Sequence, residues 1–125
     1  MSGIRFLHQN RVCHRDIKPS NILVTKDFSR VVVVDFNVAK KVEGPVGSPL
    51  EMHTHSAGTL SFAAPERLST DQYNSYTEKV DVWAAGIVLV MLLTGQHPFA
   101  EVIESSSALI SKILDSQDHL TEFIN

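Results

Sequence analysis

The sequence predicts an α+β fold, in which a mostly helical chain carries one short β-hairpin and a long loop. Three observations lead to this prediction. Residues 23–25 and the β-branched run at residues 31–34 are typical of two short neighbouring strands. Residues 35–60 have no apolar periodicity, which is typical of a loop. Residues 82–93 are almost all apolar and form a stretch long enough for a buried helix.

The first part of the chain predicts the end of a helix and then the hairpin. Residues 3–9 carry apolar side chains at helical spacing and predict the last turns of a helix. Residues 26–30 are mostly polar and form the expected turn between the strands at 23–25 and 31–34. Because the second strand contains only valine, we expect it to be buried on both faces of the sheet.

The second part of the chain predicts two helices after the long loop. Thr77 is a suitable N-cap, and the helix that follows should run to about Thr94 and end at Gly95. This helix is apolar nearly all round, so we expect protein on every side of it. A last helix is expected at residues 105–114, where four apolar residues form one stripe.

Composition and charge indicate a soluble globular protein: 43% of the 125 residues are hydrophobic, 20% are charged, and the net charge is −3. Lys40-Lys41 is the only basic cluster, which argues against nucleic acid as a partner. The longest apolar run, residues 82–93, is shorter than the ~20 residues of a membrane span. A single cysteine, Cys13, excludes an internal disulfide and fits a reducing compartment. Since no secretory signal is visible either, we expect an intracellular, cytoplasmic protein that binds no membrane.

Three short motifs follow one another in the sequence. His14-Arg15-Asp16 comes first, with Asn21 five residues after the Asp. Asp35-Phe36-Asn37 begins fourteen residues after Asn21, and Ala64-Pro65-Glu66 comes third. Their order and spacing resemble the catalytic loop, the DFG triplet and the APE triplet of eukaryotic protein kinases. Lys18-Pro19, inside the first motif, resembles the serine/threonine type.

The resemblance covers nearly the whole chain and implies a protein-kinase-like fold. Residues 1–125 would be a partial kinase domain, namely the part of the C-terminal lobe from the catalytic loop to just past the central helix. Only 13 residues precede the catalytic loop, so the N-terminal lobe is expected to be absent. The implied function is that of a serine/threonine protein kinase, inactive as an isolated fragment. The alternative is a non-catalytic truncated kinase that acts as a binding or decoy module.

The types of residue in these motifs suit phosphoryl transfer, which depends on positioning and on charge. Asp16 is expected to orient the hydroxyl of a protein substrate, since a carboxylate with a pKa near ~4 is a weak base. The ammonium of Lys18 can offset charge on the transferred group. The oxygens of Asn21 and Asp35 suit Mg²⁺, and the hairpin should bring these two residues together. The resemblance places Leu23 under the adenine ring of ATP.

The resemblance also implies regulation by phosphorylation. In the family, the Arg of the first motif pairs with a phosphate on the activation loop. Arg15 is therefore expected to be a regulatory residue, and an upstream kinase is expected to add the phosphate. Thr54 and Ser56 are the candidate phosphorylation sites, and Ser48-Pro49 offers a further, proline-directed one. Thr59 is similar to the Thr that hydrogen-bonds between the catalytic Asp and Lys, and it is expected to organise the site.

Other residues are expected to have structural roles. His14 and Phe36 should stack on each other, and Asp81 should anchor the backbone of the catalytic loop. Asn37 stands where the family has Gly, a change that Asn tolerates because it can adopt left-handed backbone angles. A zinc site is not expected, because no pair with zinc-ligand spacing has a second pair to complete it. We therefore expect solvated side chains for the histidines His8, His53 and His55.

Overall fold

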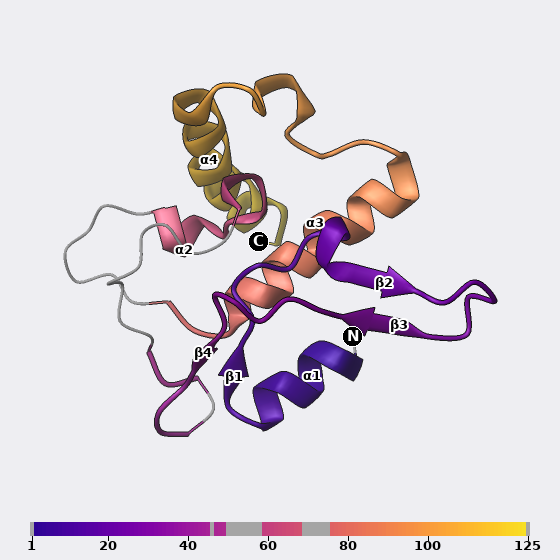
Figure 1. Cartoon of the computed structure of the whole chain (residues 1–125). Coiled ribbons are helices and arrows are strands. Elements are labelled where there is room, and N and C mark those ends of the chain that lie inside the picture. Colours follow the sequence, from indigo (N-terminus) through magenta and orange to yellow (C-terminus); the bar gives the residue numbers. More distant parts are fainter. Residues whose placement is uncertain (1, 46, 50–58, 69–75, 125) are drawn as a thin grey trace.

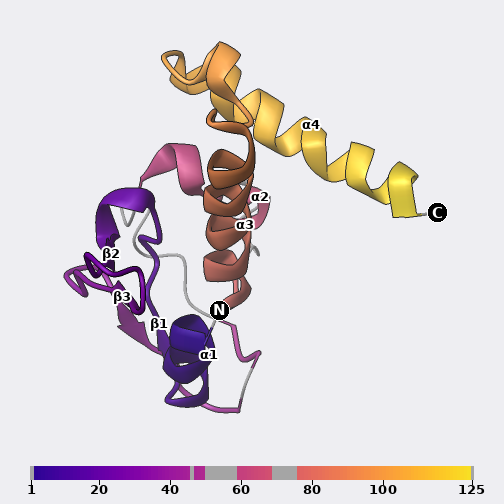
Figure 2. The ribbon, with the colours of Figure 1, turned by 90° about the vertical axis from the view of Figure 1, so that its right-hand side faces the viewer.

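The computed structural model describes residues 2–45, 47–49, 59–68 and 76–124, with only the backbone described from residue 117 onward. Its helices and strands are α1 (Ser2–Gln9), β1 (Val12–Cys13), β2 (Ile22–Val24), β3 (Val31–Val33), β4 (Lys40–Lys41), α2 (Pro65–Leu68), α3 (Lys79–Thr94) and α4 (Ser106–Ile124) (Figure 1). Short 3₁₀ helices lie at Pro19–Asn21, Leu60–Phe62 and Ala100–Val102. Helix α3 stands between two parts of the molecule: α1 and the strands lie to one side of it, and α4 extends on the other (Figure 2). These elements agree with the α+β class.

Strands β2 and β3 form the predicted hairpin, and each end lies within one residue of the expected position. They pair antiparallel, with Leu23 opposite Val32. The turn is closed by the Thr25 N–H, which donates to the Arg30 carbonyl at 3.0 Å. Inside the turn, the Thr25 hydroxyl donates to Asp27 Oδ1 at 2.7 Å. This bond is the main reason why the pKa of Asp27 is lowered to about 2.

The prediction that the valine strand is buried on both faces is wrong for the described residues. Val31 is 67% exposed and Val32 is 41% exposed, whereas Val33 packs against the core formed around Ile4 and Ile17. The sheet has two strands, and α1 lies beside one of them. A run of valines indicates strand propensity, but it does not show whether a second layer covers the strand.

The long loop contains regular structure that the sequence did not predict. β4 pairs antiparallel with β1, Cys13 lying opposite Lys40. Beyond the pair, the Val42 N–H donates to the Arg11 carbonyl at 2.7 Å. Pairs of two residues are too short to show apolar alternation, so the prediction of an irregular segment was wrong here. The pairing holds the start of the long loop beside the residues that precede the first motif.

Helix α3 begins and ends close to the predicted residues. The predicted N-cap, Thr77, is off by one residue, because Glu78 occupies the N-cap position and makes no side-chain cap bond. The Thr77 hydroxyl nevertheless accepts the Lys79 N–H at 3.3 Å. At the other end, Gly95 has a φ of +75°, and its N–H donates to the Met91 carbonyl at 2.8 Å. A left-handed residue of this kind is the usual end of a helix, and glycine adopts it without strain.

Helix α3 contributes side chains to two cores. Val80 packs with Cys13 and Ala64 in one core, and Ala84 packs with Ile17 in the other. A buried aliphatic side chain such as Ile17, which is 1% exposed, contributes about 1.5–3 kcal/mol relative to an exposed one.

Protein does not surround α3 on every side within the part of the chain that the structure describes. Leu92 and Leu93 are 78% and 77% exposed, so the prediction of a helix covered all round is wrong for these residues. An all-round apolar pattern predicts burial, but it does not indicate whether the same chain supplies the cover.

Helix α4 runs well past the predicted end at residue 114. The Ser105 hydroxyl accepts the Ala108 N–H at 3.4 Å, and Leu109 and Ile113 are buried on the predicted stripe. The apolar stripe weakens after residue 114, but no Gly or Pro interrupts residues 106–124. Among the helices that the structure describes, none is long and apolar enough to cross a membrane.

Candidate functional site

Asp81, in the first turn of α3, anchors the backbone of the loop that carries the first motif. Its Oδ1 accepts the Arg15 N–H and its Oδ2 accepts the His14 N–H, both at 2.9 Å. The carboxylate is 1% exposed, and a buried carboxylate must be hydrogen-bonded to be tolerated. The expected anchoring role of Asp81 is therefore confirmed by its contacts.

His8 is the third partner of Asp81. Its Nε2 lies 2.9 Å from Asp81 Oδ2, and its side chain is 15% exposed. The prediction of a solvated loop histidine was wrong for His8, because α1 places it against α3. His53 lies outside the described residues, as does His55.

His14 links the same loop to the segment after β3. Its ring is fully buried, its Nδ1 accepts the Asp16 N–H at 3.1 Å, and its Nε2 donates to the Val34 carbonyl at 2.9 Å. The edge of the ring meets Phe36, with the two ring centres 5.2 Å apart. The expected contact between His14 and Phe36 is thus present, and it ties the first motif to the second.

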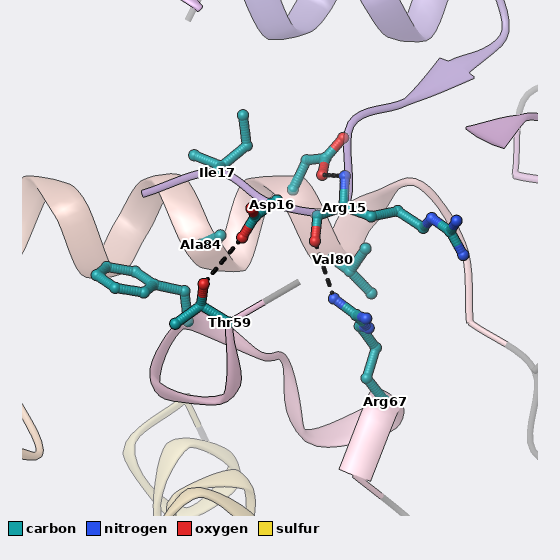
Figure 3. Close-up of a pocket in the computed structure, with 9 residues that line it drawn as sticks. Arg15, Asp16, Ile17, Thr59, Arg67, Val80 and Ala84 are labelled. Carbon is teal, nitrogen blue, oxygen red and sulfur yellow. Dashed lines mark hydrogen bonds between the residues drawn. The ribbon is translucent and has the colours of Figure 1, made fainter. Parts of the chain in front are cut away.

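Asp16, Lys18 and Thr59 form one hydrogen-bonded group. The Thr59 hydroxyl donates to Asp16 Oδ1 at 3.0 Å and accepts from Lys18 Nζ at 2.7 Å. Lys18 Nζ also lies 3.6 Å from Asp16 Oδ2. Figure 3 shows the side chains of Asp16 and Thr59 pointing toward each other. The structure thus brings together residues that are 43 positions apart in the sequence.

Asn21 and Asp35 lie at the same end of the hairpin, as the sequence predicted. The Val34 N–H donates to the Asn21 carbonyl at 2.9 Å, and Asp35 is the next residue. The Asn21 amide donates to the Asp16 carbonyl at 2.8 Å and to Asp16 Oδ2 at 3.3 Å. Asp35 has a φ of +63°, which Asp tolerates better than most residues, and its Oδ1 accepts the Asn37 N–H at 3.2 Å. Leu23 lies on β2, 56% exposed.

Arg15 is held by contacts that the sequence did not suggest. Its Nε donates to the Val38 carbonyl at 2.6 Å and its Nη1 donates to the Tyr76 hydroxyl at 3.1 Å. The Arg15 carbonyl in turn accepts Arg67 Nη1 at 3.1 Å, a bond drawn in Figure 3. Arg67 also lies over the Tyr76 ring, 5.4 Å from its centre. No sequence signal points to Arg67 or Tyr76 beyond their place after the third motif.

Two of the sequence-predicted regulatory residues, Thr54 and Ser56, lie outside the described residues. Their relation to Arg15 therefore stays a prediction.

Two cavities in the described part of the structure can be compared with the size and charge of a nucleotide. The first, about 10 Å³ in volume, is lined by Asp16, Thr59 and Arg67 among others and has room for about one water molecule. The second, about 470 Å³, lies between α1, β3 and α3, and its lining contains no charged side chain. The first is too small for a nucleotide, and the second offers no charge for phosphates.

Comparison with known proteins agrees with this arrangement. The profile of the protein kinase domain family matches residues 1–123. Serine/threonine-protein kinase cds1 of Schizosaccharomyces pombe is 43% identical over 110 residues, which are 85% of this chain and 23% of that protein. The dual specificity mitogen-activated protein kinase kinase mek-1 of Caenorhabditis elegans is 38% identical over 124 residues, which are 94% of this chain and 32% of that protein.

A third relative, from Mus musculus, carries a name that bears on activity. The inactive serine/threonine-protein kinase PLK5 is 42% identical over 100 residues, which are 80% of this chain and 16% of that protein. The chain thus spans less than a third of the length of each of these relatives. The match to the domain family and the identity to these kinases agree with the motif geometry, and the chain belongs to the eukaryotic protein kinase family.

Proposed function

We propose that residues 1–125 are part of a serine/threonine protein kinase domain, which transfers a phosphoryl group from ATP to a protein hydroxyl. The observation that carries this proposal is the hydrogen-bonded group of Asp16, Thr59 and Lys18, with Asn21 fixed against Asp16. Phosphoryl transfer needs this kind of preorganised charge more than it needs a strong base.

Asp16 would position the substrate hydroxyl. Its Oδ1 is occupied by the Thr59 hydroxyl, and its Oδ2 faces Lys18 and Asn21. A substrate hydroxyl that donates to this carboxylate is oriented for attack on the γ-phosphorus. The new O–P bond forms as the bond to the bridging oxygen breaks, ADP leaves, and the hydroxyl proton passes to Asp16 or to water.

Lys18 would stabilise the charge that develops during transfer. Its ammonium is held by Thr59 and lies near Asp16, so it needs little reorganisation when charge builds up on the phosphoryl oxygens. The side chain is 28% exposed, which leaves it accessible to a bound phosphate. The Thr59 hydroxyl would keep Lys18 and Asp16 at a fixed separation.

The donor set at the end of the hairpin fits Mg²⁺. The Asn21 amide nitrogen is used by Asp16, which leaves the amide oxygen for a cation, and Asp35 has a second carboxylate oxygen beside the one that binds Asn37. Among the described residues no three His, Cys, Asp or Glu side chains gather into a metal cage. Mg²⁺ is commonly held by one or two protein ligands together with substrate phosphates, and when bound it neutralises phosphate charge.

Leu23 would contribute to ATP binding, and Arg15 would contribute to regulation. Leu23 offers an exposed apolar surface on β2 for the adenine ring. The resemblance implies that the Arg15 guanidinium, whose planar fork suits a phosphate, receives a phosphate on Thr54 or Ser56. An upstream kinase would place that phosphate.

A second candidate function is that of a non-catalytic binding module. Two observations favour it: Asn37 stands in place of the DFG glycine, and one relative of similar identity is named as inactive. Against it stand the four polar side chains Asp16, Lys18, Asn21 and Asp35, because a binding module has no need of this set.

Calorimetry with MgATP tests the proposal. We expect the chain to bind MgATP, and we expect Asp35→Ala to abolish the heat of binding because it removes a Mg²⁺ ligand. Asp115→Ala, which removes an exposed carboxylate on α4, is the matched control and should bind like the parent chain. Equal binding by the parent chain and Asp35→Ala would contradict the proposed metal site. Transfer is assayed in a longer protein that contains residues 1–125, where binding without transfer to a peptide hydroxyl would favour the binding module.

A further inference from the structure

His97 follows the end of α3, and two hydrogen bonds fix its ring. The residue is 9% exposed and comes shortly after Gly95, where the helix ends. Its Nε2 donates to the Ser61 carbonyl at 2.8 Å, and its Nδ1 accepts the Phe99 N–H at 3.0 Å. Because a carbonyl only accepts and a backbone N–H only donates, Nε2 carries the hydrogen and Nδ1 carries none. Both nitrogens of the neutral ring are therefore in use.

Two aromatic contacts restrict the His97 ring further. It meets the Phe62 ring in a T-shaped arrangement with the ring centres 5.4 Å apart, and the centre of the Phe99 ring is 5.9 Å away. Phe62 in turn packs against the core that contains Ile17 and Ala84. Aromatic pairs of this geometry are attractive beyond their buried area. The ring is thus held by the core as well as by its hydrogen bonds, so it can fix the backbone that it contacts.

The Ser61 carbonyl belongs to the short 3₁₀ helix that follows Thr59. This helix is one turn long, and the Thr59 carbonyl accepts the Phe62 N–H at 3.0 Å. An α-helical bond to the Ser61 carbonyl cannot form, because Pro65, four residues later, has no N–H. The His97 ring supplies a donor to this carbonyl instead. A side chain beyond α3 therefore anchors the turn that begins at Thr59.

Thr59 connects this turn to the proposed chemistry. Its hydroxyl donates to Asp16 Oδ1 at 3.0 Å and accepts from Lys18 Nζ at 2.7 Å. Because Thr59 and Ser61 lie in one hydrogen-bonded turn, a displacement of the Ser61 carbonyl also displaces the Thr59 side chain. A misplacement of about 1 Å near reacting groups can lower a rate by on the order of 10²-fold.

We infer that His97 is a positioning residue for the phosphoryl transfer proposed above, and the inference rests on that proposed function. His97 holds the Ser61 carbonyl in place. Through the turn it also keeps the Thr59 hydroxyl between Asp16 and Lys18. It acts through the backbone and not on the substrate, so it is not a catalytic residue. A purely structural role would lower stability without acting through Thr59, and the two roles can be separated by experiment.

Two substitutions separate the two hydrogen bonds of His97. The amide nitrogen of Gln is as many bonds from Cβ as Nε2 is, so His97→Gln can still donate to the Ser61 carbonyl. The amide oxygen of Asn is as many bonds from Cβ as Nδ1 is, so His97→Asn can accept the Phe99 N–H but does not reach Ser61. Gln96→Asn changes the exposed neighbouring residue and is the matched control.

The first measurement is transfer to a peptide hydroxyl by a longer protein that contains residues 1–125. We expect kcat to fall about tenfold in His97→Asn and to stay within about threefold of the parent value in His97→Gln. The Kd for MgATP should be unchanged in both, which shows that the variants are folded. Adding Thr59→Val to His97→Asn should leave the loss at about tenfold, because both changes interrupt the same arrangement. A loss of about a hundredfold in the double variant, or equal losses in the Asn and Gln variants, would overturn the inference.

The second measurement needs no transfer, so it separates this inference from the proposed function. In the same protein labelled with ¹⁵N-lysine, NMR measures how fast the Lys18 ammonium protons exchange with water, and Lys18→Arg identifies the signal. We expect exchange to be about threefold faster or more in Thr59→Val and in His97→Asn, because the held acceptor of Lys18 is lost or displaced, and to be unchanged in His97→Gln. This pattern without any transfer would contradict the proposed function and leave the positioning of Thr59 by His97 supported. Equal exchange in the parent and His97→Asn would overturn the inference, whatever the activity.

Discussion

Asp81 Oδ1, at the start of α3, accepts the backbone N–H of Arg15, a residue 66 positions earlier in the chain. The loop that carries the first motif is therefore held to α3 by its backbone rather than by its side chains. Asp81 is buried and accepts a second amide, from His14, so its loss would leave two buried amides without an acceptor.

We predict that Asp81→Leu frees the catalytic loop. The two buried amides would lose their acceptor, which costs about 1–3 kcal/mol each. Hydrogen exchange of the His14 and Arg15 amides should accelerate by at least tenfold. Asp115→Leu, on the exposed face of α4, is the control and should leave both amides unchanged. Unchanged exchange in Asp81→Leu would mean that other contacts hold the loop.

Thr59→Val should impair transfer without impairing ATP binding. Valine has nearly the same shape but no hydroxyl, so Asp16 loses a donor and Lys18 loses an acceptor. In a longer protein that contains residues 1–125, we expect kcat to fall by about tenfold, the effect of one lost preorganising interaction of roughly 1.4 kcal/mol, with an unchanged Kd for MgATP. Thr94→Val, at the exposed end of α3, is the control. A raised Kd with an unchanged kcat would assign Thr59 to binding.

The local parts of the site could be predicted from the sequence. Asp16, Lys18 and Asn21 occur within six residues, so a motif fixes their spacing. The hairpin was also predictable, because its turn residues and its valines favour the same structure, and it brings Asn21 to the residue next to Asp35. Information within one segment was sufficient for these predictions.

The parts that depend on distant packing could not be predicted. His8 bonds Asp81 across 73 positions, and Arg67 bonds the Arg15 carbonyl across 52, yet no local pattern distinguishes these side chains from solvated ones. The same holds for burial. The valines of β3 predict a buried strand, but Val31 and Val32 are exposed, because exposure depends on whether another helix or sheet packs on that face. Tertiary context decides these cases.

Cys13 should be unreactive in the folded chain. Its thiol is fully buried, and burial, with the nearby Asp81 carboxylate adding to it, raises its pKa far above the ordinary value. Labelling with iodoacetamide at pH 8 should be at least a hundredfold slower than in urea. Fast labelling of the native chain would contradict the burial.

The same shift in the Cys13 pKa predicts a pH dependence of stability. Because the pKa is raised by folding, the contribution is fully present below the unfolded pKa of about 8.5 and decreases above it. The free energy of unfolding should fall by up to about 1.4 kcal/mol per pH unit above pH 8.5. Cys13→Ala is the control: it should lose this slope, and a slope that persists in Cys13→Ala would have to come from another group.

The open face of α3 predicts self-association of the chain. Leu92 and Leu93 are 78% and 77% exposed, and exposed leucines of this kind favour aggregation. We expect the double variant Leu92→Glu, Leu93→Glu to keep its helical content and to remain dispersed at several-fold higher concentration in light scattering. Leu109→Glu is the contrasting control, because this residue on α4 is 2% exposed and a charge there should disrupt packing. If the double variant aggregates at the same concentration as the parent chain, another surface drives the association.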